Sequence, residues 1–404
     1  MDSKAGRVRV TGPLVEYAAG FATELSRIGY TENATADQVR LLAHLSRWLA
    51  GHRLAAADLT HETCDAFLAA RRAEGYTLWL SRQALVPMLD YLRDIGVVPP
   101  VPAASRSPRE ALLAHYHEYL ISERGLKHST ASGYINFVTP FLRQRETPEG
   151  RLRLDDLRAR DITSFVVATV PGRPMGSAKL TVCALRSLLG FLHINGMLSQ
   201  SLVAAVPSVA GSRLAGLPKA LERGQVQQLL ATCDRSTAVG GRDYAVLTML
   251  TRLGLRAGEV AAMELDDIDW RSGEIIVRGK GDRRERLPLP VDVGRALSAY
   301  LRRARPVSEC RSLFMRVRAP HRGLTSAGVG AIVSWAARKA GLPPTRSHRL
   351  RHTAATQMLR SGASLAEVGQ VLRHRSALST AIYAKVDRLA LRQIARPWPD
   401  GSAA

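Results

Sequence analysis

The first 206 residues of this chain carry one helical pattern twice, and this repeat restricts the fold more than any other feature of the sequence. Ile28-Gly29-Tyr30 and Arg124-Gly125-Leu126 each follow an amphipathic stretch and stand 96 residues apart. Asp58-Leu59 through Phe67 match Asp156-Leu157 through Phe165 at an offset of 98 residues. At an offset of 100 residues, Leu85, Leu89, Leu92 and Gly96 match Leu185, Leu189, Leu192 and Gly196. A solenoid needs at least about three units, so two copies predict tandem modules of about four helices each.

Apolar side chains in the second copy recur at the spacing of one helical face. They are Leu185, Leu188, Leu189 and Leu192. This spacing predicts that they form the core of the module, and the glycine after each copy's last helix is expected to end that helix. We therefore expect one helical module over residues 1–104 and a second over residues 105–206.

A change of composition follows the repeat. Residues 207–216 are mostly small and turn-forming, which predicts an interdomain linker. The rest of the chain, 217–404, begins with helical stretches at 226–232 and 243–253. Short alternating segments separated by turns then occupy 268–289 and predict a three-stranded antiparallel meander. The expected fold class is therefore mainly α with a small antiparallel β-meander, in which helical modules precede a mixed α/β domain.

Beyond the meander, the chain is expected to return to helices from Pro290 until Pro397. One boundary in this part is well defined by its residues. Gly362 is expected to end a helix, and Ser364 with Glu367 forms a capping box that opens the next one.

Composition restricts the class of protein. Hydrophobic residues make up 46% of the 404 residues and charged residues 23%, a balance typical of globular proteins. No uninterrupted apolar run approaches the roughly 18–20 residues of a membrane span, and Met1–Lys4 is not followed by the apolar core of a secretion signal. The four cysteines are far apart and are expected to be reduced core thiols of a cytoplasmic protein: Cys64, Cys183, Cys233 and Cys310.

The net charge of +22 is unevenly distributed along the chain. Seven of the 57 basic residues are lysines, an arginine preference that a GC-rich coding bias explains, but such a bias does not explain an excess over acids. The net charge is 0 over residues 1–104, +5 over 105–210 and +17 over 211–404. A positive surface confined to the last half of the chain predicts a polyanionic partner, and nucleic acid is the partner we expect.

Six residues of the last half combine into one reactive constellation. They are Arg256, Lys280, His348, Arg351, His374 and Tyr383. Lys280 stands at the tip of the second predicted hairpin, and His348 and Arg351, three residues apart, project from one helical face. Each residue alone is weak evidence, because the chain has 50 arginines and a single histidine or tyrosine is usually structural. The ordered set is far more specific.

The chemistry that fits this set is phosphoryl transfer. Arg256 and Arg351 can clamp a phosphodiester and neutralise developing charge, while Tyr383 attacks phosphorus and forms a covalent intermediate without ATP. We expect surrounding cations to lower the pKa of Tyr383 and His348 to take or orient its proton. Lys280 is expected to protonate the leaving 5′ oxygen. No metal or other cofactor is expected, because the arginines supply the charge that a metal would.

At this point the sequence resembles the tyrosine recombinases, also called phage integrases. The order Arg, Lys, His-x-x-Arg, His, Tyr and the stretch 348–356 carry the resemblance, which covers about 217–394. Leu217–Leu221 is similar to the start of that family's catalytic domain, and Gly279–Leu289 is similar to its β-hairpin. More loosely, 108–206 resembles the family's helical, SAM-like core-binding domain. The resemblance implies that Tyr383 forms a 3′-phosphotyrosyl bond, assisted by the other five residues.

Two departures from the family pattern matter. The family usually has glycine before the second histidine, where this chain has Arg373; with Arg375 it is expected either to contact a phosphate or to be solvated. Glu259 is interpreted as a structural partner of Arg256, and His352 as a core residue or a support for the site. The residues expected to contact DNA are Lys219, Arg283, Arg284, Arg373 and Arg375.

The expected function is that of a site-specific DNA recombinase or integrase acting in integration, excision or transposition of a mobile element. It is expected to assemble as a tetramer on double-stranded DNA in a bacterial cytoplasm, associated with the nucleoid and working alongside other recombinases of the same element. The apolar segment around Leu389, Leu391 and Ile394 either docks on a neighbouring subunit or packs in cis. The neutral module 1–104 serves either contacts between protomers or outer DNA sequence. A type IB topoisomerase and a catalytically inactive accessory protein are the rival functions.

Overall fold

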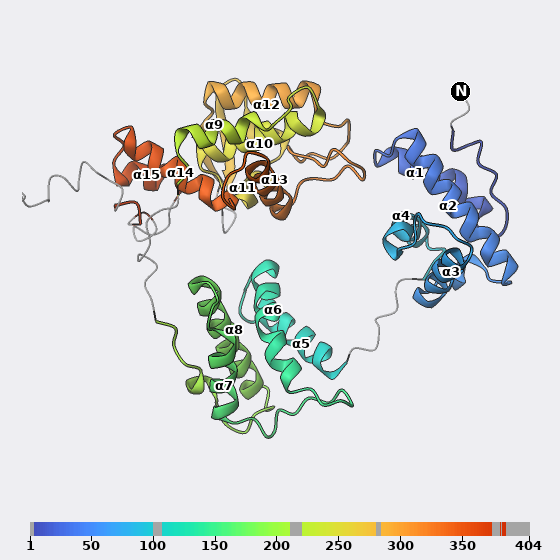
Figure 1. Cartoon of the computed structure of the whole chain (residues 1–404), viewed down its shortest axis with the longest axis horizontal. Coiled ribbons are helices and arrows are strands. Elements are labelled where there is room, and N and C mark those ends of the chain that lie inside the picture. The colour runs from blue at the N-terminus through green and yellow to red at the C-terminus, as the bar shows by residue number, and fades with distance from the viewer. Residues whose placement is uncertain are drawn as a thin grey trace, which may run out of the picture. The chain divides into compact units, whose positions relative to one another are not determined.

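A computed structural model of the chain describes residues 4–99, 107–210, 220–279, 284–373, 380 and 382–384. The described residues are predominantly helical, with one small sheet, which confirms the expected fold class (Figure 1). Residues 101–215 form one compact unit, and residues 1–100 and 216–404 are grouped in a second. Separate buried cores lie in the first module, in the second module and in the last half of the chain.

The first module is built from amphipathic helices around its own apolar core. Its helices are η1 (Val15–Tyr17), α1 (Ala18–Arg27), α2 (Glu32–Gly51), η2 (Ala56–Asp58), α3 (His61–Ala73) and α4 (Arg82–Asp94). Threonine side chains cap two of these helices, because the hydroxyls of Thr31 and Thr60 accept from backbone N–H groups three residues later.

The second module repeats this arrangement, as the sequence repeat predicts. Its helices are α5 (Pro108–Ser122), α6 (His128–Gln144), α7 (Ala159–Thr169), α8 (Met175–Ile194) and η3 (Val203–Ala205). The predicted core leucines of α8 are 0–1% exposed, and Gly96 and Gly196 follow α4 and α8 in the left-handed conformation that ends a helix, with φ of 75° and 69°. The helical repeat and its core are therefore confirmed.

Helix α8 is long and apolar enough to cross a membrane by length and composition alone. In the structure it packs against α5 and α6, and its apolar residues contribute to the core of the second module. The hydropathy of α8 therefore matches the role of a core helix.

We predict that Leu188→Ala destabilises the second module by about 2–5 kcal/mol, because it leaves a cavity in a closed core. Leu180→Ala on the same helix removes an exposed side chain, 47% accessible, and should change stability by less than about 0.5 kcal/mol. Native-state hydrogen exchange of the α8 amides in the full chain measures both. Equal effects of the two variants would contradict the core assignment.

The last half of the chain packs helices around a small sheet. Its elements are α9 (Arg223–Ala231), α10 (Ala238–Leu253), α11 (Ala257–Ala261), η4 (Leu265–Asp267), β1 (Ile268–Asp269), β2 (Glu274–Arg278), β3 (Arg284–Pro288), α12 (Val291–Arg303), α13 (Ser326–Lys339), α14 (Ser347–Arg360) and α15 (Leu365–Val371). The strands pair antiparallel in the order β1-β2-β3, with Ile275 opposite Leu287, so the meander is confirmed. Helix α10 packs against α12 and α14 at the centre of this core.

Two expectations are corrected by the structure. The stretch between α12 and α13 is not helical: it runs as loops with isolated bridges, in which Ser312 pairs with Glu264 and Met315 with Gly323. Cys183 is not a core thiol but is exposed, and its sulfur lies 3.1 Å from the hydroxyl of Tyr134. Most of the predicted linker, from residue 211 on, and the tail from 385 lie outside the described residues.

Candidate active site

The site begins where α10 ends and α11 starts. Gly254 closes α10 with φ of 59°, and a Cβ there would lie 2.6 Å from Leu372 and 3.3 Å from Ala354, so only glycine fits this packed turn. Two residues later Arg256 is the N-cap of α11, and its side chain is 46% exposed. The turn therefore presents a guanidinium to solvent from a rigid backbone.

Helix α14 supplies the second arginine. Arg351 is 1% exposed, and its guanidinium donates to the carbonyl oxygen of Gly254 at 2.7 Å and to that of Leu372. Burial, followed by the charge of Arg256, lowers the pKa of Arg351 to about 10, so the side chain stays charged at neutral pH. Arg351 thus joins the end of α10 to the end of α15 and holds a positive charge beneath the site.

Tyr383 lies in a small apolar core beside α14 rather than at the surface. The ring is 1% exposed and packs with Ala355, Leu359, Val368 and Leu372. Burial raises the pKa of Tyr383, and the charge of Arg351 only partly opposes this. The expectation that surrounding cations lower this pKa is therefore wrong for the described conformation, because desolvation of the phenolate outweighs the attraction of Arg351.

The hydroxyl of Tyr383 contacts His352, which from the sequence is interpreted only as a core residue or a support for the site. Nδ1 of His352 lies 2.9 Å from this oxygen, and the ring centroids of the two residues are 5.5 Å apart. The ring of His352 also lies 4.5 Å from that of His348, one turn earlier on α14. The spacing of the two histidines could have indicated that His352 belongs to the site, since residues four apart share a helical face and His348 was already assigned to that face.

Neutral imidazoles dominate this part of the site. Burial, then His348 and Arg351, lowers the pKa of His352 to about 4. His348 keeps an exposed edge, and desolvation of the rest of its ring, with the charges of Arg351 and Arg256, lowers its pKa as well. At neutral pH His352 is therefore uncharged and can accept the phenolic proton of Tyr383 or donate to its oxygen, depending on its tautomer.

Glu259 forms ion pairs with two arginines, Arg256 and Arg373. One carboxylate oxygen accepts from Nη1 of Arg256 at 2.6 Å, and the other accepts from the backbone N–H of Arg256 at 2.8 Å and from Nη2 of Arg373 at 2.6 Å. The interpretation of Glu259 as the partner of Arg256 is confirmed. The side chain of Arg373 is only 4% exposed and pairs with Glu259, so the expectation of a solvated arginine is wrong, and in the described conformation the guanidinium is not exposed for a phosphate contact.

Arg373 also has an unusual backbone conformation. Its φ of 55° lies in the left-handed region, which costs a residue with a Cβ about 1–2 kcal/mol relative to glycine. The glycine that the family resemblance implies at this position would avoid this cost. Nε of Arg373 lies 3.7 Å from the carboxylate of Glu285 on β3, so the side chain connects the end of α15 to the sheet.

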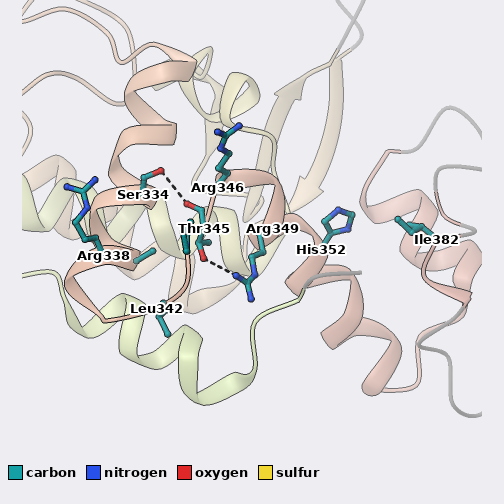
Figure 2. A pocket seen from close by; sticks show the side chains of 10 residues that line it. Ser334, Arg338, Leu342, Thr345, Arg346, Arg349, His352 and Ile382 are labelled. Carbon is teal, nitrogen blue, oxygen red and sulfur yellow. Dashed lines mark hydrogen bonds between the residues drawn. The ribbon is translucent and has the colours of Figure 1, made fainter. Parts of the chain in front are cut away.

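A cavity of about 600 Å³ opens beside His352 (Figure 2). It is lined from α13, from the loop before α14, from α14 itself and from Ile382, with Arg338, Arg346 and His352 among its walls. Ser334 donates to the backbone carbonyl of Thr345 at 3.3 Å within it. The histidine that contacts Tyr383 therefore also borders a cavity whose walls carry arginine side chains.

The structure places only part of the predicted set. Arg256, His348, Arg351 and Tyr383 all belong to this region of α11, α14 and the segment beyond α15, and Arg284 is exposed on β3. The remaining predicted residues lie outside the described residues: Lys219, Lys280, Arg283, His374 and Arg375. Within the described ranges no group of three or more His, Cys, Asp or Glu side chains gathers in a way that can hold a metal ion.

Comparison with known proteins decides the family. Residues 219–389 match the model of the phage integrase family. A putative integrase/recombinase of Sinorhizobium fredii, y4rA, is 41% identical over 393 residues, which cover 96% of this chain and 95% of the relative. The tyrosine recombinase XerD of Listeria monocytogenes is 31% identical over 288 residues, covering 70% of this chain and 96% of XerD. The chain belongs to the phage integrase family of tyrosine recombinases.

This membership extends beyond the catalytic half, because the similarity to y4rA includes the N-terminal module. The fold is also shared with a lambda integrase tetramer bound to a Holliday junction, with a TM-score of 0.52 and 18% identity over 76% of this chain and 88% of that one. As a tyrosine recombinase the chain is an enzyme that cleaves and rejoins DNA strands, and DNA is its substrate.

We predict that the free energy of unfolding of this tyrosine recombinase falls as the pH is lowered from about 6.5 to about 4. The pKa of His352 is about 4 in the folded protein against about 6.5 in an unfolded chain, so between these values the unfolded chain binds more protons. The part due to His352 is on the order of 1–3 kcal/mol. His352→Gln should remove it.

Urea unfolding of the full chain, followed by tryptophan fluorescence, measures this dependence at each pH. His61→Gln, at an exposed histidine of the first module, is the matched control and should leave the slope unchanged. Parallel pH profiles for wild type and His352→Gln would show that the ring of His352 is not desolvated.

Proposed function

We propose that this tyrosine recombinase is a site-specific recombinase that exchanges DNA strands through a 3′-phosphotyrosyl intermediate on Tyr383. We further propose that it serves the integration, excision or transposition of a mobile element. The observation that carries the proposal is the contact between the hydroxyl of Tyr383 and His352, on the same helix that supplies His348 and Arg351. A potential nucleophile, a proton acceptor and a buried cation are thereby collected along one face of α14.

In the proposed reaction one phosphorus–oxygen bond forms as another breaks. The phenolic oxygen of Tyr383 attacks the scissile phosphorus, the bond from phosphorus to the 5′ oxygen breaks, and the 3′ side of the strand stays attached to the enzyme. The phenolic proton passes to a neighbouring base, for which we propose His352 or His348, and the leaving 5′ oxygen takes a proton, for which we propose Lys280. The reverse reaction with a 5′ hydroxyl from another strand completes the exchange.

We propose that two arginines stabilise the negative charge that develops on the phosphate during the reaction. Arg256 offers an exposed guanidinium beside the turn at Gly254, and a planar guanidinium can donate two hydrogen bonds to phosphate oxygens. Arg351 contributes from a buried position, where low dielectric strengthens its effect on a developing negative charge. We propose that these cations make a metal unnecessary, and that the phosphotyrosyl bond stores the energy that would otherwise come from ATP.

Cleavage requires Tyr383 to leave its apolar core. A ring that is 1% exposed cannot reach a phosphate in a DNA duplex, and burial keeps its hydroxyl protonated. We propose that DNA binding moves the segment containing Tyr383 toward Arg256 and Arg351. There the two guanidinium groups lower the pKa of Tyr383, which burial raises.

Assembly and cellular setting follow from the same proposal. Exchange between two duplexes needs four cleavage events, so we propose a tetramer on DNA, which the shared fold with the lambda integrase tetramer supports. Other recombinases of the same element are proposed partners, and the proposed location is a bacterial cytoplasm, at the nucleoid. We propose that the neutral first module serves either contacts between protomers or outer DNA sequence.

We predict that Tyr383→Phe abolishes covalent trapping on DNA while leaving affinity within about twofold, because only the attacking oxygen is removed. The substrate is a duplex nicked near the cleavage site, so that the released end diffuses away; candidate sites come from the DNA flanking the gene. Tyr244→Phe removes a hydroxyl from the same domain and should trap DNA normally. A denaturing gel measures the adduct and a mobility shift measures binding.

The same assay separates the rival functions. Relaxation of supercoiled DNA by a monomer without recombination between sites would favour a type IB topoisomerase. Binding without any adduct from the wild type would contradict the enzymatic proposal and favour an inactive accessory protein.

We predict that deletion of residues 1–104 impairs synapsis more than DNA affinity, because this module adds no net charge with which to neutralise phosphates. Mobility shifts on one site measure affinity, and bridging of two sites measures synapsis. Loss of affinity with synapsis intact would contradict a role between protomers and favour recognition of outer DNA sequence.

A further inference from the structure

The carboxylate of Glu259 lies between two guanidinium groups that differ in their surroundings. The side chain of Glu259 is 6% exposed and that of Arg373 is 4% exposed, so their 2.6 Å ion pair is buried. The side chain of Arg256, at 2.6 Å on the other oxygen, is 46% exposed. The carboxylate is therefore screened from solvent on the side of Arg373 and linked to the surface through Arg256.

The charge balance of this trio determines what Arg256 offers to an anion. Without Arg373, Glu259 and Arg256 form a neutral pair whose carboxylate opposes the field of the guanidinium. With Arg373, two cations face this carboxylate. A second carboxylate, that of Glu285, lies 3.7 Å from Nε of Arg373 but is 43% exposed and therefore more strongly screened, so a net positive charge remains around Glu259. Because Glu259 and Arg373 are buried, the attraction between them is weakly screened, whereas solvent partly screens the 46% exposed side chain of Arg256.

The field of the trio reaches the other arginine of the site as well. After burial, Arg256 and Arg373 lower the pKa of Arg351, whereas Glu259 raises it. The three side chains thus act on the same small region in which the proposed phosphate lies.

The backbone gives no reason for an arginine at position 373. The left-handed φ of 55° favours glycine, so the arginine is retained against a conformational penalty. The arginine adds a positive charge that pairs with Glu259 and a weaker ion pair with Glu285 at 3.7 Å. It also adds a hydrogen bond from Nη1 to the carbonyl oxygen of Val371 at 3.3 Å.

We infer that Arg373 is a positioning residue that neutralises Glu259 and thereby leaves the positive charge of Arg256 available to the scissile phosphate. This inference rests on the proposed function in one respect, that Arg256 faces that phosphate. Arg373 itself acts through Glu259 and stays buried behind it.

The test uses three variants of the full chain. Arg373→Gly removes the charge and suits the left-handed backbone, Arg373→Lys keeps the charge, and the double variant Arg373→Gly with Glu259→Gln removes both charges. Arg360→Ala is the matched control, because it removes one arginine from an exposed ion pair with Glu222 at the end of α14. Single-turnover adduct formation at saturating nicked DNA gives the rate, and titration gives the affinity.

Arg373→Gly should slow adduct formation about tenfold, a partial loss of one charged contact in the transition state, with affinity within about twofold. Arg373→Lys should recover most of the rate. Glu259→Gln in the Arg373→Gly background should also recover it, because the opposing carboxylate is gone. Arg360→Ala should cleave as the wild type does.

Two results would overturn the inference. A wild-type rate for Arg373→Gly would show that the charge does not reach Arg256. A slow rate in all three variants, accompanied by equal losses of thermal stability, would show that Arg373 only holds the structure together.

Failure of the proposed function is recognised separately, by the absence of an adduct from the wild type itself. The inference is then tested on the protein without DNA. The Nε–H resonance of Arg256, assigned with Arg256→Lys, should shift in Arg373→Gly and not in Arg360→Ala. No shift in Arg373→Gly would overturn the inference.

Discussion

A buried arginine organises the last half of this tyrosine recombinase. The guanidinium of Arg351 donates to the carbonyl oxygens of Gly254 and Leu372, which end α10 and α15 respectively. An arginine that is 1% exposed is stable only when such acceptors surround it, since an unpaired buried charge is very costly. The turn that presents Arg256 and the turn that carries Arg373 are therefore both held to α14, and the geometry of the site follows from this requirement.

The same burial explains the resting state of Tyr383. Its ring completes a small apolar core against α14 and α15, and its hydroxyl is satisfied by His352. The surroundings keep both groups neutral, because desolvation raises the pKa of the phenol and lowers that of the imidazole. In this conformation Tyr383, the proposed nucleophile, is kept protonated, which suits an enzyme that must not cleave before its DNA substrate is in place.

Much of the fold was predictable because local patterns agree with it. The leucines of α8, the capping box formed by Ser364 and Glu367, and the alternating residues of the meander each indicate their element from a few neighbours. The irregular stretch between α12 and α13 was missed, because it is held by pairing to distant residues such as Glu264. Helical spacing also pointed to His348 and Arg351 as one face. The chemistry of the set suggested His348 as the residue that takes or orients the proton of Tyr383, while the described contact is with His352.

By itself the sequence determined the order of the modules, the duplicated helices, the basic character of the last half and the set of residue types suited to phosphoryl transfer. These properties depend on composition and on contacts within about four residues, which a linear pattern records. Only the tertiary structure decided that Arg373 is buried on Glu259 and that Tyr383 rests against His352 with a raised pKa. Burial and charge pairing arise from residues 31 to 114 positions apart, so no local pattern carries them.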